Sequence, residues 1–337
     1  MSIYFRKYGE KIECTLCPHF CKVSPGKTGI CGVRKNTGNG IELITYSQIS
    51  GFSLDHVEKK PLYHYFPGYY VFSIGSYGCN MRCDFCQNYS ISQVVPEQSV
   101  KTLSPSEIVS LALKEKNNIG IAFTYNEPTI SFEFIRDVAV EAKTEGLKTV
   151  LVSNGYVNRE PLSEIIGFID AFNIDLKAFN NASYRKLTGG DLLPVLNSLT
   201  QITASGKHLE ITSLIIPGYN DGPEEMISQV EWISAELGQN IPLHLSRYYP
   251  MYKRNDPVTP FDTIEKLFRI AAESLNYVYI GNIHSEKGQD TICPSCGLTI
   301  TERSGYITRN INVDEQGNCS GCKTKIYKNF TFSLKDH

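Results

Sequence analysis

Short apolar segments recur along the chain from residue 71 onward, and most are followed by a longer segment with a helical pattern of apolar positions. The short segments are rich in β-branched residues and mostly apolar on both faces, which is typical of strands buried in a parallel sheet. We therefore expect strands at residues 71–77, 118–124, 148–154, 171–177, 208–216 and 242–248, with a shorter one at 277–282.

Helical segments are predicted between these strands. The first begins with a capping box, because Ser104 precedes Pro105 and Glu107 follows three residues later. Several of the others end at a glycine, a common helix terminator. The expected helices cover residues 105–116, 130–145, 161–166, 194–204, 223–237 and 261–275.

The repeated strand–helix units predict an α/β fold with parallel strands and right-handed crossovers. Two folds are compatible with this pattern, an open doubly wound sheet and a partial barrel, and both bind ligands at the carboxyl ends of their strands. We expect this unit to span residues 71–282. The flanking segments, 1–70 and 283–337, contain too few residues to bury a secure core of their own, so we expect metal-stapled appendages there.

The composition of the 337 residues is that of an ordinary globular protein, with 41% hydrophobic and 20% charged residues. A formal net charge of −2 disfavours nucleic acid or an anionic membrane as a partner. No apolar run approaches the ~20 residues that a membrane helix needs. The first ten residues lack the apolar core of a secretory signal, so we expect a cytoplasmic protein.

All 11 cysteines fall into three groups. In a reducing compartment such groups are metal ligands more often than disulfides, and an odd total argues against a complete disulfide framework. The groups are Cys14, Cys17, Cys21 and Cys31; Cys79, Cys83 and Cys86; and Cys293, Cys296, Cys319 and Cys322.

The central group has three members and therefore leaves a coordination position open. A 4Fe–4S cluster normally takes four thiolates, so three would leave one iron free to bind a ligand. The alternative is a zinc knuckle that takes a distant histidine such as His56 or His64.

Each outer group can fill a four-ligand site by itself. The C-terminal group has two Cys-x2-Cys knuckles separated by 22 residues, which predicts a zinc ribbon, with an auxiliary iron–sulfur cluster as the rival. The spacing of the N-terminal group does not separate zinc from iron–sulfur, because thiolates suit both. An iron–sulfur cluster there would relay electrons, whereas zinc would stabilise the fold of the segment or a surface for docking.

The motif Cys-x3-Cys-x2-Cys after the first strand, in "GCNMRCDFCQNYS", resembles that of radical S-adenosylmethionine (SAM) enzymes. This resemblance implies a partial (β/α)6 barrel in which the open iron binds the amine and carboxylate of SAM. One electron from the cluster then cleaves SAM to methionine and a 5′-deoxyadenosyl radical that abstracts a hydrogen atom. Phe85 matches a position where the family often has an aromatic residue near adenine.

Further stretches make the resemblance narrower. The chain resembles the pyruvate formate-lyase activating enzyme group and, within it, the AmmeMemoRadiSam-system radical SAM proteins. The stretches that carry it are "CTLCPHFCKVSPGKTGICGVR", "EKKPLYHYFPG", "GCNMRCDFCQNYSIS", "FTYNEPTI", "VSNGY", "NIDLKAF", "PLHLSRYYP" and "YIGN…CPSC…CSGC".

Several SAM-binding positions follow from this resemblance. In "TYNEP", Asn126 and Glu127 match the turn that holds the SAM amine, although a tyrosine and an asparagine replace two glycines. In "VSNG", Ser153 and Asn154 match a motif near the ribose, but Val152 replaces an aspartate that helps to hold a monovalent cation, which leaves that cation site in doubt.

The fourth and later strands carry further candidates. Asp175 and Lys177 are two residues apart on an extended segment, so both point to one face, where Lys177 can meet the SAM carboxylate. Their alternative role is a structural ion pair at the rim. Ser213 is expected near the adenosine. His244 and Arg247 either face the substrate cavity or satisfy the core.

The resemblance implies glycyl-radical activation of a partner protein, in which a hydrogen atom is abstracted from a glycine, with a one-electron donor such as flavodoxin or ferredoxin. The AmmeMemoRadiSam likeness implies a different system, in which another protein, a nucleic acid or a small molecule is modified. A non-catalytic metal-binding interaction protein is the rival from another class, and it leaves Glu127, Asp175 and Lys177 without a shared purpose.

Overall fold

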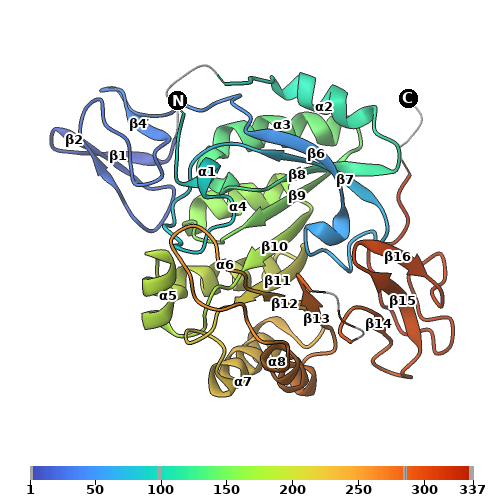
Figure 1. Cartoon of the computed structure of the whole chain (residues 1–337). Helices are drawn as coiled ribbons and strands as arrows, with labels where there is room; N and C mark the ends of the chain where they lie inside the picture. The colour runs from blue at the N-terminus through green and yellow to red at the C-terminus, as the bar shows by residue number, and fades with distance from the viewer. Residues whose placement is uncertain (1–2, 97–99, 284, 286, 334–337) are drawn as a thin grey trace.

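The fold is built on one eight-stranded sheet that curves through the centre of the molecule (Figure 1). The structure is a computed structural model that describes residues 3–96, 100–283, 285 and 287–333. The strands of this sheet are β6 (Gly51–His56), β7 (Tyr70–Gly75), β8 (Asn118–Phe123), β9 (Lys148–Ser153), β10 (Ala171–Asp175), β11 (His208–Ile215), β12 (Leu243–Arg247) and β13 (Val278–Gly281).

Neighbouring strands of the sheet follow one another in sequence from β6 to β13. All pairs from β7 to β13 are parallel, and only β6 joins antiparallel to β7. A doubly wound sheet would reverse its strand order at a switch point, and this sheet does not. The prediction of a radical SAM-type partial barrel is therefore confirmed. Although β6 lies within the predicted N-terminal segment 1–70, it belongs to the central sheet.

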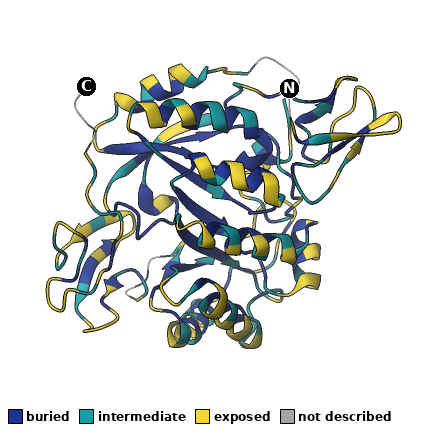
Figure 2. Ribbon diagram, turned by 180° about the vertical axis from the view of Figure 1, so that it is seen from behind, coloured by how far each residue is buried: buried dark blue, intermediate teal, exposed yellow. Residues whose placement is uncertain are grey.

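Helices cover the outer face of the sheet, as the view from behind shows (Figure 2). The predicted capping box at Ser104 and Glu107 is present. The sequence analysis missed α5, whose residues are mostly polar, and the short α1. The helices are α1 (Tyr89–Ser92), α2 (Pro105–Leu113), α3 (Phe132–Thr144), α4 (Arg159–Phe168), α5 (Asn181–Thr188), α6 (Leu192–Ala204), α7 (Pro223–Trp232) and α8 (Phe261–Ser274), with 3₁₀ turns at Val57–Lys59 and Pro128–Ser131 and a π turn at Ile233–Leu237.

The segment between β6 and β7 fills the amino-terminal end of the barrel. Its buried Val57, Leu62 and Tyr65 pack against residues of β7 to β10. The backbone amides of Tyr63 and His64 donate to the carboxylate of Glu210 on β11, at 2.9 and 2.7 Å.

This packing decides between the two roles considered for His244. Its Nε2 lies 2.7 Å from the buried Glu210 carboxylate, and its ring contacts Tyr63 edge-on. His244 therefore satisfies the core and does not face a substrate cavity. Arg247 Nε donates to the carbonyl of Thr259 at 2.7 Å.

Two small appendages lie at opposite ends of the barrel (Figure 1). The N-terminal one meets the carboxyl ends of the strands, where Asn158 N donates to Leu16 O at 3.1 Å. The C-terminal one meets the amino ends, where Arg303 donates to the carbonyl of Tyr63 at 2.9 Å. Their strands are β1 (Phe5–Tyr8), β2 (Lys11–Cys14), β3 (Lys22–Val23), β4 (Arg34–Asn36) and β5 (Ile41–Leu43), and then β14 (Thr291–Ile292), β15 (Thr299–Ser304) and β16 (Ile307–Asn310).

Among the described residues, we find no helix that combines the length and the apolar character needed to cross a membrane.

Candidate active site

The three central cysteines lie on the loop that leaves the carboxyl end of β7. The loop starts at Gly78, whose φ of +84° is the left-handed conformation that glycine tolerates. A side chain there would also come within 2.6 Å of the carbonyl oxygen of Cys31. Farther along, Asn80 Nδ2 donates to Tyr156 O at 2.7 Å. The loop is therefore held closely against both the barrel and the N-terminal appendage.

Charged groups from two other strands approach these thiols. Burial and the neighbouring Glu127 carboxylate raise the pKa of Cys79 well above its usual value. Burial raises the pKa of Cys83 to about 12, while the Lys177 ammonium acts in the opposite direction. Bare thiolates are thus disfavoured here, and bound iron is what would keep such cysteines deprotonated. The donor set fits a cluster with one open iron.

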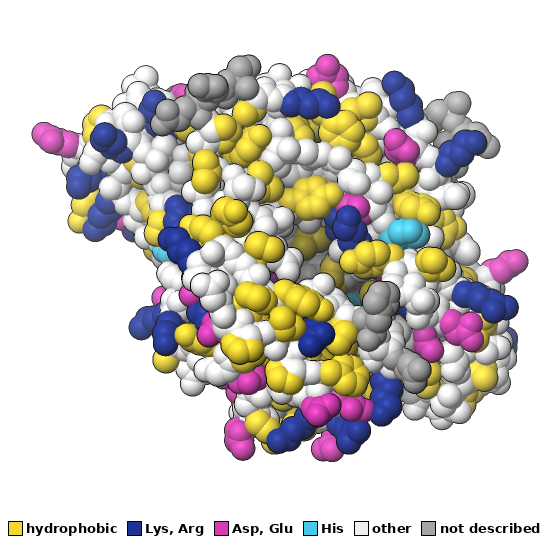
Figure 3. Space-filling view, viewed as in Figure 1, with side chains coloured by type: hydrophobic (Ala, Val, Ile, Leu, Met, Phe, Trp, Pro, Cys, Tyr) yellow, Lys and Arg dark blue, Asp and Glu magenta, His cyan; other side chains and the backbone are white. Residues whose placement is uncertain are grey.

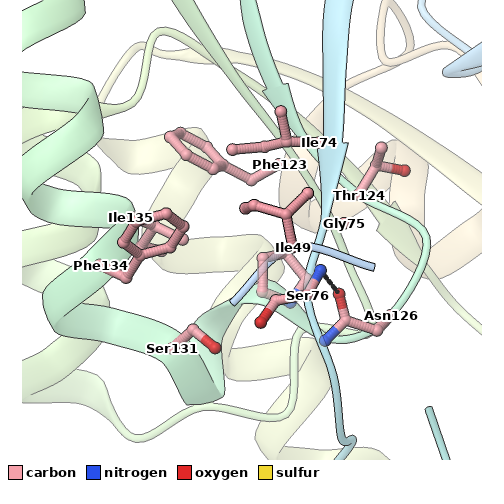
Figure 4. Close-up of a pocket in the computed structure, with 11 residues that line it drawn as sticks. Ile49, Ile74, Gly75, Ser76, Phe123, Thr124, Asn126, Ser131, Phe134 and Ile135 are labelled. Atoms are coloured by element: carbon pink, nitrogen blue, oxygen red, sulfur yellow. Dashed lines mark hydrogen bonds between the residues drawn. The ribbon is translucent and has the colours of Figure 1, made fainter. Parts of the chain in front are cut away.

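The turn after β8 carries Asn126 and braces the cysteine loop. Asn126 Nδ2 donates to Gly78 O at 3.0 Å, and its Oδ1 accepts from Ser76 N at 3.1 Å (Figure 4). Tyr125 has a φ of +72°, the left-handed conformation that glycine tolerates best. The pocket in Figure 4 lies behind this turn, between β7, β8 and the start of α3, and its lining is mostly apolar.

Glu127 is 1% exposed, and its carboxylate is bonded to the motif that follows β9. Its Oε1 accepts from Ser153 Oγ at 2.8 Å and from the amide and hydroxyl of Thr129 at 3.0 and 2.7 Å. Its Oε2 accepts from Asn154 N at 2.8 Å. Burial raises the pKa of Glu127, and these donors oppose the rise. Since a carboxylate offers about four acceptor sites, Oε2 keeps room for one more donor.

Asn154 connects this carboxylate to the first cysteine. Its Nδ2 lies 2.9 Å from Asn80 Oδ1 and 3.7 Å from Cys79 Sγ, and its Oδ1 accepts from Tyr156 N at 2.9 Å. Ser153 Oγ, besides donating to Glu127, accepts from Gly155 N at 3.0 Å. The sequence motifs after β8 and β9 therefore form one hydrogen-bonded network beside the cysteine loop.

Asp175 and Lys177 lie on the same side of the site, at the end of β10. Lys177 Nζ donates to Asp175 Oδ2 at 2.8 Å, and the lysine side chain is 14% exposed. Burial disfavours the ammonium, but Asp175 and the nearby Cys83 together hold the pKa of Lys177 above its usual value. Lys177 is thus a fixed positive charge beside the second cysteine.

Comparison with known proteins places these residues in a family. The sequence profile of the "Radical SAM superfamily" matches residues 73–230, which include the three cysteines, Glu127 and Lys177. The chain is 38% identical over 330 residues to "Uncharacterized protein MJ0808" from Methanocaldococcus jannaschii, covering 96% of this chain and 98% of that protein. The chain belongs to the radical SAM superfamily. Membership of this superfamily implies a 4Fe–4S cluster and SAM as cofactors.

Two further comparisons are more distant. The chain is 24% identical over 180 residues to "Pyruvate formate-lyase 1-activating enzyme" from Escherichia coli, covering 52% of this chain and 73% of that protein. The crystal structure of a "radical SAM methyltransferase" from Sphaerobacter thermophilus superposes with a TM-score of 0.52 and 14% identity, covering 70% of this chain and 71% of that one. The latter supports the radical SAM fold alone.

Two candidates from the sequence lie deeper than the others. Ser213 is 1% exposed, and its hydroxyl donates to Leu176 O at 3.0 Å and accepts from Gln229 Nε2 at 2.9 Å. This arrangement positions the segment before Lys177. Phe85 is buried in the main hydrophobic core. Contact of either residue with the adenosine of SAM stays a prediction.

The sequence analysis missed a charged cluster that links the segment between β6 and β7 to Tyr125 in the turn after β8. Asp55 accepts from Lys59, Lys60 and Tyr125, each at 2.7 Å, and Lys60 is buried. The alternation of β6 was too weak to identify Asp55, although the lysines stand in the quoted stretch "EKKPLYHYFPG". These contacts keep the pKa of Asp55 below its usual value despite its partial burial.

The loop after β12 closes over the cysteine loop from the other side. Arg254 pairs with Asp84 at 2.7 Å, and Lys253 N donates to Asp84 O at 3.0 Å. Exposed Tyr252 stacks on Tyr89 with ring centroids 4.6 Å apart. On this face the molecule is hollowed near its centre, and hydrophobic side chains border the hollow (Figure 3).

A separate group of cysteines lies far from this site. The ligand atoms of Cys293, Cys296, Cys319 and Cys322 all lie within 4.8 Å of one another and could hold a metal ion. The Sγ atoms of Cys293 and Cys322 are 3.5 Å apart, and those of Cys296 and Cys319 are 3.6 Å apart.

Proposed function

We propose that this protein reductively cleaves SAM at a cluster held by Cys79, Cys83 and Cys86 and abstracts a hydrogen atom from a partner protein. One observation carries the proposal. The three-cysteine loop shares the carboxyl end of the barrel with a fixed cation, Lys177, and with the buried carboxylate of Glu127. A protein that only bound a metal and a partner would not require three thiols, a buried carboxylate and a fixed cation at the same end of the barrel.

The residues would divide the work as follows. The three thiolates hold the cluster, which, together with SAM, supplies the one-electron chemistry that generates the hydrogen-abstracting radical. Lys177, oriented by Asp175 at 2.8 Å, is the partner for the SAM carboxylate. The free acceptor capacity of Glu127 and the carbonyls of its turn suit the SAM amine. Asn126, Ser153 and Asn154 position this turn through the hydrogen bonds described above.

A protein substrate is supported by the likeness to pyruvate formate-lyase activating enzymes, which covers 52% of this chain. The rival is the modification of another substrate, as the AmmeMemoRadiSam resemblance implies. The stronger likeness, over 96% of the chain, is to "Uncharacterized protein MJ0808", whose name assigns no substrate and leaves this rival open. In both cases the reaction requires a one-electron donor such as flavodoxin or ferredoxin.

The C-terminal group of cysteines fits zinc. Four thiolates around one tetrahedral zinc, at ≈2.3 Å each, would lie about 3.8 Å apart. The observed separations of 3.5 and 3.6 Å are close to that value. With all four positions filled by the protein, such a zinc would be structural.

Isotope transfer tests the choice of substrate. The reconstituted, reduced protein is incubated anaerobically with SAM and an extract of cells grown on glycine deuterated at Cα. The extract is divided by size filtration into protein and small molecules. Deuterium in 5′-deoxyadenosine is expected only with the protein fraction. Deuterium transfer from the small-molecule fraction would refute a protein substrate, and deuterium-free 5′-deoxyadenosine would refute abstraction from glycine.

A further inference from the structure

The four N-terminal cysteines converge on one pocket. Its lining combines these thiols with apolar side chains and one arginine: Cys14, Leu16, Cys17, Cys21, Gly29, Ile30, Cys31, Arg34 and Ile130. Ile30 N donates to Cys21 Sγ at 3.5 Å. Burial raises the pKa of Cys14, Cys17 and Cys31, and the backbone amides of Leu16, His19, Val33 and Arg34 oppose this rise. Amide N–H groups that face a buried thiol stabilise its thiolate form, which is the form that binds a metal ion or cluster.

The thiols of this pocket lie farther apart than those of the C-terminal group. Within the described parts of the chain, the C-terminal cysteines are the one set of three or more Cys, His, Asp or Glu whose ligand atoms all lie within 4.8 Å. No three of the N-terminal thiols meet this limit. A single zinc ion draws its four sulfurs to about 3.8 Å from one another. A 4Fe–4S cluster places a separate iron beneath each thiolate and therefore holds the sulfurs farther apart.

Arg34 supplies an independent sign of a bound group. Its side chain is buried, with the residue 1% exposed, and lines the pocket. Its Nε donates to Ile130 O at 2.7 Å and its Nη1 pairs with Glu133 at 2.8 Å. Its Nη2 has no hydrogen-bond partner among the described residues. A buried guanidinium N–H left free beside four thiolates is suited to donate to the sulfur of an anionic cluster, which also raises its reduction potential.

The pocket also adjoins the loop that holds the SAM-site cysteines. The carbonyl oxygen of Cys31 lies so close to Gly78 that a Cβ there would approach it to 2.6 Å, and Gly78 directly precedes Cys79. Arg82 donates to Ile30 O, and His19 Nε2 lies 2.7 Å from Asn80 O. The backbone segments that carry the two cysteine groups are therefore in direct contact. On the outer side, Ile30 is 41% exposed, so a donor protein can reach the pocket.

We infer that Cys14, Cys17, Cys21 and Cys31 bind a second 4Fe–4S cluster that passes electrons to the SAM-site cluster. One electron from a low-potential donor protein, such as flavodoxin, reduces the N-terminal cluster. The same electron moves to the SAM-site cluster, which returns the N-terminal cluster to its oxidised state, and it is consumed when one SAM is cleaved. The electron path rests on the proposed function, whereas the presence of the cluster does not.

The cluster is tested in a full-length variant, Cys79→Ala/Cys83→Ala/Cys86→Ala, purified anaerobically. We expect it to retain about four iron and four sulfide per chain and the absorbance and EPR signal of a 4Fe–4S cluster. A variant that also carries Cys17→Ala should lose them. A second zinc in place of this iron would overturn the inference even if SAM chemistry at the central site is correct.

The electron path is tested by changing the reductant. In Cys17→Ser/Cys21→Ser, SAM cleavage with dithionite should stay near that of the wild type, because this small reductant reaches the SAM-site cluster directly. Cleavage with flavodoxin should be largely lost. Thr28→Ala, an exposed change in the same appendage, serves as the control and should support both reactions.

Two results would overturn the electron path. One is equal cleavage by the double variant with both reductants, which would make the N-terminal cluster structural. The other is an equal loss with both reductants while circular dichroism and the EPR signal of the SAM-site cluster stay unchanged. If the double variant does not fold, the iron content of the variant without central cysteines still decides whether the second cluster exists.

Discussion

The two outer cysteine groups look alike in sequence and differ in the structure. Each contributes four thiols from a short appendage, yet among the described residues only the C-terminal four form a set whose sulfurs all lie within 4.8 Å of one another. The C-terminal group lies at the amino ends of the strands, and the N-terminal group lies against the SAM-site loop. These two differences support our proposals that the C-terminal group holds a structural metal and that the N-terminal group carries electrons.

The residues packed around the two outer cysteine groups also differ. The C-terminal cysteines belong to a small core of their own with Ile300, Ile326 and Tyr327. A metal there stabilises a segment that buries little else. The N-terminal cysteines Cys14 and Cys31 pack against the barrel, and a buried arginine with a free N–H lies beside them.

The largest expected effect is on SAM cleavage, which should depend on the cysteine loop at the carboxyl end of the barrel and not on the surface of the C-terminal appendage. Cys83→Ala removes a cluster ligand, so SAM cleavage by the reduced protein should fall to background. Ser320→Ala, an exposed change between two cysteines of the C-terminal group, should leave cleavage unchanged. The measurement is 5′-deoxyadenosine formed anaerobically with dithionite. Product from Cys83→Ala at the wild-type rate would show that the three-cysteine loop is not the reaction centre.

The next largest effect is expected on the stability of the C-terminal appendage. Cys319 is fully buried, and Cys319→Ser should release the metal and loosen the appendage around β14 to β16. Structural zinc supplies roughly 10 kcal/mol of binding free energy in small domains, so the loss should exceed that of an ordinary core substitution. Hydrogen exchange should rise across residues 291–332, while SAM cleavage persists in part. Complete loss of cleavage with an intact barrel would link this metal to catalysis.

A smaller effect is expected for SAM binding. Lys177→Ala removes a charge-assisted contact, which should cost on the order of 1.5–3 kcal/mol, or roughly 10- to 150-fold in affinity. The iron content should not change. Lys143→Ala, which removes an outer ion pair with Asp170, is the matched control. Calorimetry with SAM measures both variants, and equal affinities would reduce Lys177 to a structural ion pair.

The smallest effect tests how the C-terminal appendage is joined to the barrel. His64 Nδ1 lies 3.4 Å from Ile326 O in the C-terminal appendage, and its Nε2 lies 2.6 Å from Tyr279 OH on β13. Burial lowers the pKa of His64 to about 3. Because the unfolded state takes up a proton near pH 6.5 and the folded state does not, acidification destabilises the fold between these values. From pH 7.5 to 5.5 the loss attributable to His64 should be about 1.4 kcal/mol.

Denaturant titration of the wild type and of His64→Phe at both pH values measures this effect. The wild type should lose more stability on acidification than the variant. Carboxylates such as Glu210, whose pKa is lowered, lose their contribution only in a more acidic range. An equal pH dependence of the two proteins would exclude His64 as its source.

Much of the barrel could be predicted from sequence, because parallel buried strands are apolar on both faces and their helices carry clear start and stop signals. The seven predicted strands from β7 to β13 each match one observed strand. β6 could not be predicted, since it is an edge strand with the mixed pattern "GFSLDH". Its place in the sheet depends on pairing with β7, which is not a local property.

The parts of the candidate site that depend on local sequence motifs could be predicted, whereas the contacts between distant strands could not. Motifs at strand ends identified the cysteine loop, Glu127 and Lys177, which the fold brings to one end of the barrel. The role of Glu127 as an anchor for Ser153 and Asn154 depends on contacts between strands and could be read only from the structure. The same holds for Arg34, which is separated from its partner Ile130 by 96 residues.

The most direct test of the difference between the N-terminal and C-terminal cysteine groups is the metal content of the wild-type protein. The protein is purified anaerobically and reconstituted with iron and sulfide. The close set of four thiols in the C-terminal group, which the described residues of the other two groups do not form, predicts about eight iron, eight sulfide and one zinc per chain. About four iron and two zinc would contradict the account by placing zinc in the N-terminal pocket. About twelve iron without zinc would contradict it by placing a cluster in the C-terminal group.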